Sequence, residues 1–87
     1  MSSDEVLSRV LEIVLRTAGA HRTPAGAPEE TALGEGGFWL DSVELLEIVV
    51  ACEQAFGVEL DPDTDLTQEG LKDARALARR IEAKLAG

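Results

Sequence analysis

The sequence is poor in residues that support redox chemistry, metal binding or aromatic packing. Its 87 residues include one cysteine, one histidine, three aromatic side chains and no tyrosine. A lone cysteine, Cys52, excludes an internal disulfide, and a reducing compartment is the simplest setting for it. The histidine, His21, has no cysteine or second histidine near it, which argues against a metal site. Because 45% of the residues are hydrophobic but only 3% are aromatic, the core must be largely aliphatic.

Long apolar runs are also missing. The longest uncharged apolar stretch covers residues 48–52, whereas a membrane-spanning helix needs about 20 such residues. Residues 1–5 are polar and acidic, so they lack the basic start and apolar run of a secretory signal. We therefore expect a soluble, cytoplasmic protein.

Basic residues are absent from the middle of the chain. No lysine or arginine lies between Thr23 and Leu71, where twelve acidic residues occur, and the formal net charge of the chain is −9. This charge argues against nucleic acid and anionic membranes as partners. A solvated acidic face would explain the pattern. A docking surface for partners with basic patches is the alternative that we favour, because complementary charges give fast and reversible binding.

The length and the hydrophobic periodicity predict one small helical domain over residues 1–87. Apolar residues recur at helical spacing over residues 4–18, 43–56 and 73–85, and no strand pattern is present. A short helical turn is expected at residues 67–70. The sequence therefore predicts an all-α four-helix bundle with three long helices and one short third helix.

A loop rich in glycine and proline separates the first two predicted helices. It covers residues 19–40, and loops of this length are uncommon in compact domains unless they are functional. We expect Leu33, together with Phe38 or Leu40, to reach the core from this loop.

The second predicted helix opens with an informative pair, Asp41 and Ser42. Asp41 is a plausible N-cap, and Glu44 follows three residues later, which is the spacing of a capping box. Ser42 then lies in the first helical turn, where an exposed hydroxyl faces the positive end of the helix dipole. That is a favourable place to attach a phosphate. The dipeptide alone favours an ordinary serine that is tolerated in a capped helix, so the hypothesis depends on the surrounding sequence.

Helical spacing divides residues 43–56 into two faces. The inward positions are Leu45, Val49, Cys52 and Phe56. The outward face combines carboxylates with aliphatic side chains: Val43, Glu44, Leu46, Glu47, Val50, Glu53 and Gln54. Exposed aliphatic side chains among carboxylates are typical of a binding surface.

Together these segments resemble the acyl carrier proteins. Residues 40–47 read Leu-Asp-Ser-Val-Glu-Leu-Leu-Glu, and residues 56–60 read Phe-Gly-Val-Glu-Leu. The resemblance implies that Ser42 carries 4′-phosphopantetheine through a phosphodiester and that the terminal thiol of this arm holds an acyl group as a thioester. It also implies a recognition helix read by partner enzymes. The residues that match it are Asp41, Val43, Glu44, Glu47, Val50 and Glu53.

Three features depart from the pattern of that family. Trp39 stands where many members have a small residue, commonly glycine; it would shape a pocket entrance, contact a partner or cover the loop. Cys52 stands where a large aliphatic residue is usual, and we interpret it as a small core hydrophobe. The Gly-Gly-x-Ser signature of peptidyl carriers is absent, which weighs against an aminoacyl cargo without excluding it.

The acidic run at Asp61, Asp63 and Asp65 has the spacing that begins a calcium loop. Leu66 and Lys72 stand where that loop requires glycine and glutamate. We therefore expect no metal site, although loose screening of divalent cations by this run stays open.

The resemblance predicts a non-catalytic, monomeric carrier, and no Ser-His-Asp arrangement or phosphate-cradling glycine loop argues for an enzyme. Its expected partners are a phosphopantetheinyl transferase and acyl-loading, condensing and tailoring enzymes with basic docking patches.

The start at Met1 and the end at Gly87 favour a discrete carrier. The departures favour polyketide or other secondary-metabolite assembly, with a fatty-acid or aminoacyl/peptidyl carrier as alternatives. A rival of another class is an unmodified acidic helical adaptor, for which Ser42 is incidental.

Overall fold

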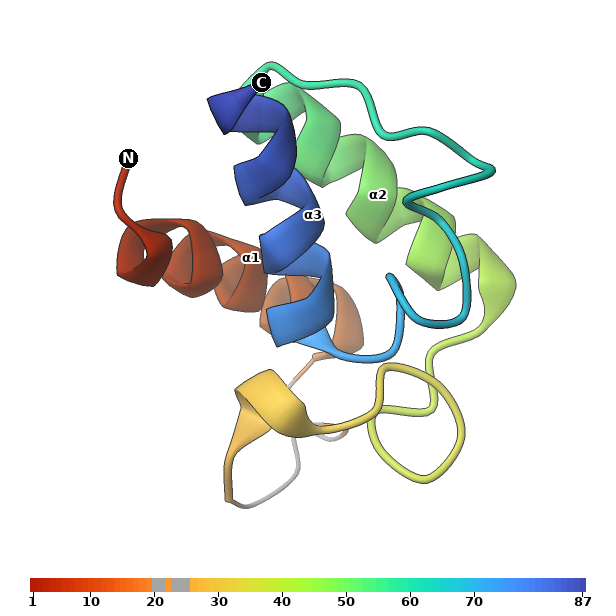
Figure 1. The fold of residues 1–87 in the computed structure, drawn as a ribbon. Coiled ribbons are helices and arrows are strands. Elements are labelled where there is room, and N and C mark those ends of the chain that lie inside the picture. The colour runs from red at the N-terminus through yellow and green to blue at the C-terminus, as the bar shows by residue number, and fades with distance from the viewer. Residues whose placement is uncertain (20–21, 23–25) are drawn as a thin grey trace.

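The computed structural model describes all residues except 20–21 and 23–25. Along the described chain the elements are α1 (Ser3–Ala18), the short 3₁₀ helix η2 (Pro28–Glu30), α2 (Ser42–Phe56) and α3 (Ala74–Ala86). No strand occurs among these elements, so the predicted all-helical class is confirmed. Figure 1 shows α3 crossing in front of α1, with α2 beside them and the loop that carries η2 beneath. Helix α1 contacts both α2 and α3.

Side-chain caps fix where α1 and α3 begin. Ser2 accepts a hydrogen bond from the Glu5 backbone N–H at 3.2 Å, and the Glu5 carboxylate accepts one from the Ser2 N–H at 3.3 Å. Asp73 caps α3 by accepting from the Ala76 N–H at 2.8 Å. Each cap satisfies backbone donors that have no partner inside the helix, which stabilises that boundary.

The core is largely aliphatic, as predicted, and draws on the three α helices and the long loop. The largest fully buried side chains are Phe38, Leu33, Ile48, Leu77, Ile81, Val6, Val10, Val14 and Cys52. Leu40 is also buried. Leu33 and both of the alternatives, Phe38 and Leu40, therefore reach the core from the loop. The Leu33 N–H donates to the Lys72 carbonyl at 3.0 Å, and the Leu40 N–H donates to the Leu33 carbonyl at the same distance. These bonds tie the loop before α2 to the entry of α3.

The expected short third helix is not confirmed. Residues 67–70 form hydrogen-bonded turns, in which the Leu71 N–H donates to the Thr67 carbonyl at 2.9 Å. Gly70 lies so close to the preceding turn that an added Cβ would be 1.9 Å from the Asp65 carbonyl oxygen. Because the N-cap of α3 follows at Asp73, this turn has no room to propagate into a helix. The described residues therefore form three α helices rather than four.

The acidic run before these turns stabilises the fold. The Asp61 side chain accepts from the Asp63 N–H at 2.8 Å, and the buried Asp65 carboxylate accepts from the Asp61 N–H at 2.8 Å. Asp65 also pairs with Lys84 of α3 at 3.0 Å. The hydrogen bond from Asp61 and the charge of Lys84 hold the pKa of Asp65 below its ordinary value. The carboxylates of Asp61 and Asp65 are thus engaged with backbone N–H groups and with Lys84.

No helix among the described residues is long and apolar enough to cross a membrane. No group of three or more histidine, cysteine or acidic side chains in them is arranged to hold a metal ion. His21 lies outside the described residues.

Candidate functional site

The start of α2 is held by the capping box that the sequence predicts. Asp41 has an extended backbone (φ −83°, ψ 177°), and its side chain accepts from the Glu44 N–H at 2.8 Å. The Glu44 carboxylate accepts in turn from the Asp41 N–H at 3.2 Å. This reciprocal pair fixes the first turn of α2 and hence the direction in which its first residues project.

Ser42 is the first residue of α2 and its side chain is exposed. Its hydroxyl makes no hydrogen bond to another described residue. The first-turn amides and the positive end of the helix dipole lie beside it, and they favour an anion there by about 0.3 to 1 kcal/mol. The site therefore offers an accessible hydroxyl with room for a bulky substituent and a favourable place for the phosphate of that substituent.

A charged contact that the sequence analysis missed ties α1 to the first turn of α2. Arg22 Nη1 donates to Glu44 Oε1 at 2.8 Å, and Nη2 of the same guanidinium pairs with Oε2. Arg22 Nε also donates to the Ala18 carbonyl at 2.9 Å, at the end of α1. The hydrogen bond to Glu44 and the charges of Glu44 and Asp41 raise the pKa of Arg22. The guanidinium offsets part of the negative charge beside Ser42.

The acidic residues expected on the recognition face of α2 lie in different environments. Glu47 is exposed, as expected for a residue that meets a partner. Glu44 and Glu53 are half-buried, and their carboxylates are engaged within the fold. Glu44 binds Arg22, and Glu53 accepts from the Leu60 N–H at 2.9 Å beyond the end of α2. The exposed charge beside the aliphatic side chains of α2 is therefore carried by Glu47.

Three aliphatic side chains of α2 face outward. Val43, Leu46 and Val50 are between 42% and 64% exposed. With Glu47, Ala51 and Gln54 they line a shallow groove of about 370 Å³. We call Val43, Leu46, Glu47 and Val50 the docking face. Apolar side chains gathered on one helix beside a carboxylate form a surface that a partner can cover.

The opposite face of α2 lies in the core. Val49, Cys52 and Phe56 are buried, as predicted; Ile48 is buried as well, and Leu45 is half-buried. Burial raises the pKa of the Cys52 thiol to about 12, with a further contribution from the charge of Glu53. Cys52 is therefore a core side chain and not a nucleophile.

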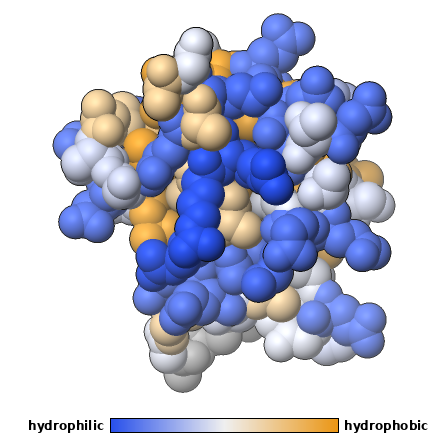
Figure 2. Space-filling model, in the orientation of Figure 1, coloured by the Kyte–Doolittle hydropathy of each residue, from blue (hydrophilic) through white to orange (hydrophobic). Residues whose placement is uncertain are grey.

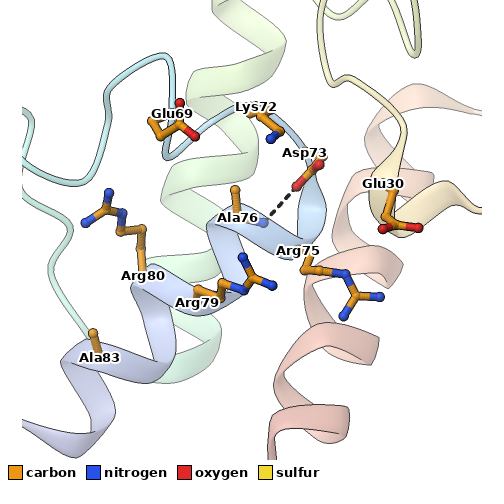
Figure 3. A pocket seen from close by; sticks show the side chains of 9 residues that line it. All are labelled: Glu30, Glu69, Lys72, Asp73, Arg75, Ala76, Arg79, Arg80 and Ala83. Atoms are coloured by element: carbon orange, nitrogen blue, oxygen red, sulfur yellow. Dashed lines mark hydrogen bonds between the residues drawn. The ribbon is translucent and has the colours of Figure 1, made fainter.

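A second concave feature runs along α3. This groove has a volume of about 360 Å³. Figure 3 shows Arg75, Arg79 and Arg80 projecting from the helix, with Glu30 and Glu69 at the margins. Figure 2 shows that the surface over α3 is strongly hydrophilic. The lining contains no hydroxyl, thiol or imidazole. This groove therefore offers no attachment point, and the candidate site stays at the start of α2.

Comparison with known proteins agrees with this geometry. The family model described as phosphopantetheine attachment site (PP-binding) matches residues 8–81, which include α2 and most of α1 and α3. No curated protein and no solved structure matches the chain. Members of the matched family attach 4′-phosphopantetheine covalently to a conserved serine, and they are carriers rather than catalysts. The chain thus belongs to the PP-binding family of phosphopantetheine-dependent carriers.

Proposed function

We propose that this chain is an acyl carrier protein with 4′-phosphopantetheine attached to Oγ of Ser42. Two serines, Ser8 and Ser42, lie in the range matched by the family model. Ser8 lies within α1, whereas Ser42 begins α2. The observation that carries the proposal is the exposed hydroxyl of Ser42 at the N-terminus of a capped helix, which combines access with stabilisation of a phosphodiester anion.

The residues around Ser42 have separable roles in this proposal. Asp41 holds the first turn of α2 and so sets the direction of the hydroxyl. Arg22 offsets the charge of Glu44, which would otherwise oppose an anion at this position. When the arm is attached, its terminal thiol supplies the thioester link to an acyl group.

The docking face supplies the second requirement of a carrier, which is to bind several enzymes briefly. A phosphopantetheinyl transferase and acyl-loading, condensing and tailoring enzymes with basic docking patches would cover Val43, Leu46 and Val50 and meet the charge of Glu47. A small apolar area limits affinity, while opposite charge speeds encounter. Exchange between enzymes follows from that combination.

We further propose that residues 1–87 act as one monomeric carrier domain in the cytoplasm, in polyketide or other secondary-metabolite assembly. The support for this choice of pathway is Trp39 and Cys52, the loop rich in glycine and proline, and the arginines of α3. A fatty-acid carrier and an aminoacyl or peptidyl carrier are the alternatives. Identification of the thioester on protein isolated from its native cell tests this choice directly.

The attachment is tested with a promiscuous phosphopantetheinyl transferase and coenzyme A. Ser42 Oγ forms a bond to the phosphorus of the pantetheine phosphate, the pyrophosphate bond of coenzyme A breaks, and adenosine 3′,5′-bisphosphate and the serine proton leave. Intact-mass analysis should show one added arm on the wild type and on the control Ser8→Ala, and none on Ser42→Ala, with helicity retained in all three. A folded wild type that gains no arm would support the unmodified adaptor instead.

A further inference from the structure

Trp39 has a backbone conformation that is unusual for its residue type. Its φ is +57°, and among the described residues it is the one non-glycine residue with positive φ. This region is sterically unfavourable for a bulky L side chain, so such residues are uncommon there and tend to mark functional positions. The indole is 62% exposed, whereas its neighbour Phe38 is fully buried.

The loop geometry explains why the backbone turns at this point. The Phe38 N–H donates to the Ala32 carbonyl at 2.8 Å, and the Trp39 N–H donates to the Gly34 carbonyl at 2.9 Å. Phe38 and Leu40, on either side of Trp39, both enter the core. The left-handed conformation at residue 39 allows both neighbours to point inward. Glycine would meet that requirement without strain, so the requirement does not account for an exposed tryptophan.

The position of Trp39 relates it to the candidate site. It lies two residues before the N-cap Asp41 and three before Ser42. The sequence around it is acidic: Asp41 and Glu47 are exposed, and no lysine or arginine occurs between Thr23 and Leu71. The nearest preceding basic residue, Arg22, is engaged with Glu44.

We propose that Trp39 is a partner-contact residue at the Ser42 end of the docking face and that it receives a cationic side chain of the partner enzyme on its indole ring. The inference rests on the proposed carrier function. The indole ring is the strongest cation–π acceptor among the side chains, and tryptophan is enriched among residues that dominate binding energy. A partner whose basic face is attracted to α2 supplies the cation, since Arg22 is already engaged with Glu44.

The first test compares loading kinetics of Trp39→Asn, Trp39→Phe and the control Leu85→Asn with those of the wild type. Asparagine tolerates the left-handed conformation, and Leu85 is an exposed apolar side chain at the far end of α3. With the transferase and coenzyme A, Trp39→Asn should raise the KM for the carrier at least about fivefold, with little change in kcat, as expected for loss of an anchor residue. Trp39→Phe should lie between, and Leu85→Asn should match the wild type. An unchanged KM in folded Trp39→Asn overturns the proposal.

The second test observes the indole directly. Because Trp39 is the sole tryptophan, protein labelled with 5-fluorotryptophan gives one ¹⁹F resonance. Titration with unlabelled transferase should shift or broaden it, whereas an unperturbed resonance at saturation overturns the contact. Both tests are separable from the attachment experiment. A wild type that accepts no arm contradicts the carrier function, while equal KM values among variants that do accept the arm contradict only the role of Trp39.

Discussion

Two side chains with nucleophilic atoms lie in opposite environments on α2. The hydroxyl of Ser42 is exposed, whereas the thiol of Cys52 is fully buried in the core. Burial raises the pKa of Cys52 to about 12. At pH 8 the thiolate is then present at about one part in ten thousand, and the folded protein shields even that fraction.

This contrast predicts how many thiols react. The folded protein without its arm should not react with a thiol reagent at pH 8, and the folded protein carrying the arm should react once. Denaturation should expose Cys52 and add one reactive thiol in each case. Absorbance titration with a disulfide reagent measures these counts. Rapid reaction of the folded, unmodified protein would mean that Cys52 is accessible, contrary to its burial.

At the scale of single residues, the sequence predicts what depends on local spacing. The capping pair Asp41 and Glu44 follows from a spacing of three residues, and the outward position of Val43 follows from helical periodicity; the structure confirms both. The contact of Arg22 with Glu44 spans 22 residues and leaves no periodic signal. The positive φ of Trp39 was also unpredicted, since glycine is the residue that usually marks such a conformation. The assignment of Ser42 as the attachment point stays a prediction.

The N-cap of α2 provides a test at the level of the helix. Asp41→Ala removes the acceptor of the Glu44 N–H and should lower the free energy of unfolding by about 1 kcal/mol. Asp41→Asn retains a good capping side chain and should change stability little, but it removes the charge. Urea unfolding followed by circular dichroism measures both.

The same two variants distinguish the role of Asp41 as a helix cap from a role in partner binding. If the charge of Asp41 contributes to partner binding, Asp41→Asn should load more slowly while its stability stays near that of the wild type. An equal loss of stability in Asp41→Asn and Asp41→Ala would contradict the capping assignment.

Helical periodicity predicted the three α helices closely, and it failed where an element was a single turn. The predicted segments 4–18, 43–56 and 73–85 correspond to Ser3–Ala18, Ser42–Phe56 and Ala74–Ala86. Each contains enough repeats of the apolar pattern to determine a face. Residues 67–70 contain no such repeat, and the close approach of Gly70 to Asp65 depends on tertiary packing. A lone turn and a short helix therefore look alike in the sequence.

Charge is separated across the whole molecule. The acidic middle of the sequence supplies α2, whereas α3 and the residue before its cap carry Lys72, Arg75, Arg79, Arg80 and Lys84. Lys84 is paired with Asp65, and the three arginines line the groove in Figure 3. A partner with a basic face is attracted towards α2 and repelled by the arginines of α3. Such a field favours encounters in one orientation and increases the association rate.

Reversing one exposed charge on each helix tests this orientation. Glu47→Lys should lower kcat/KM for loading by the transferase several-fold at low salt, because it places a cation on the docking face. The loss should shrink as salt rises, since exposed charges are screened beyond about 8 Å at physiological ionic strength. Arg79→Glu changes the charge by the same amount in the opposite sense on α3, and it should load as fast as the wild type or faster. Both substitutions should change the free energy of unfolding by no more than about 0.5 kcal/mol.

An equal loss of loading in the two variants would mean that α3, and not only the docking face, meets the enzyme. Unchanged loading by Glu47→Lys at low salt would remove charge attraction at Glu47 from the proposed function.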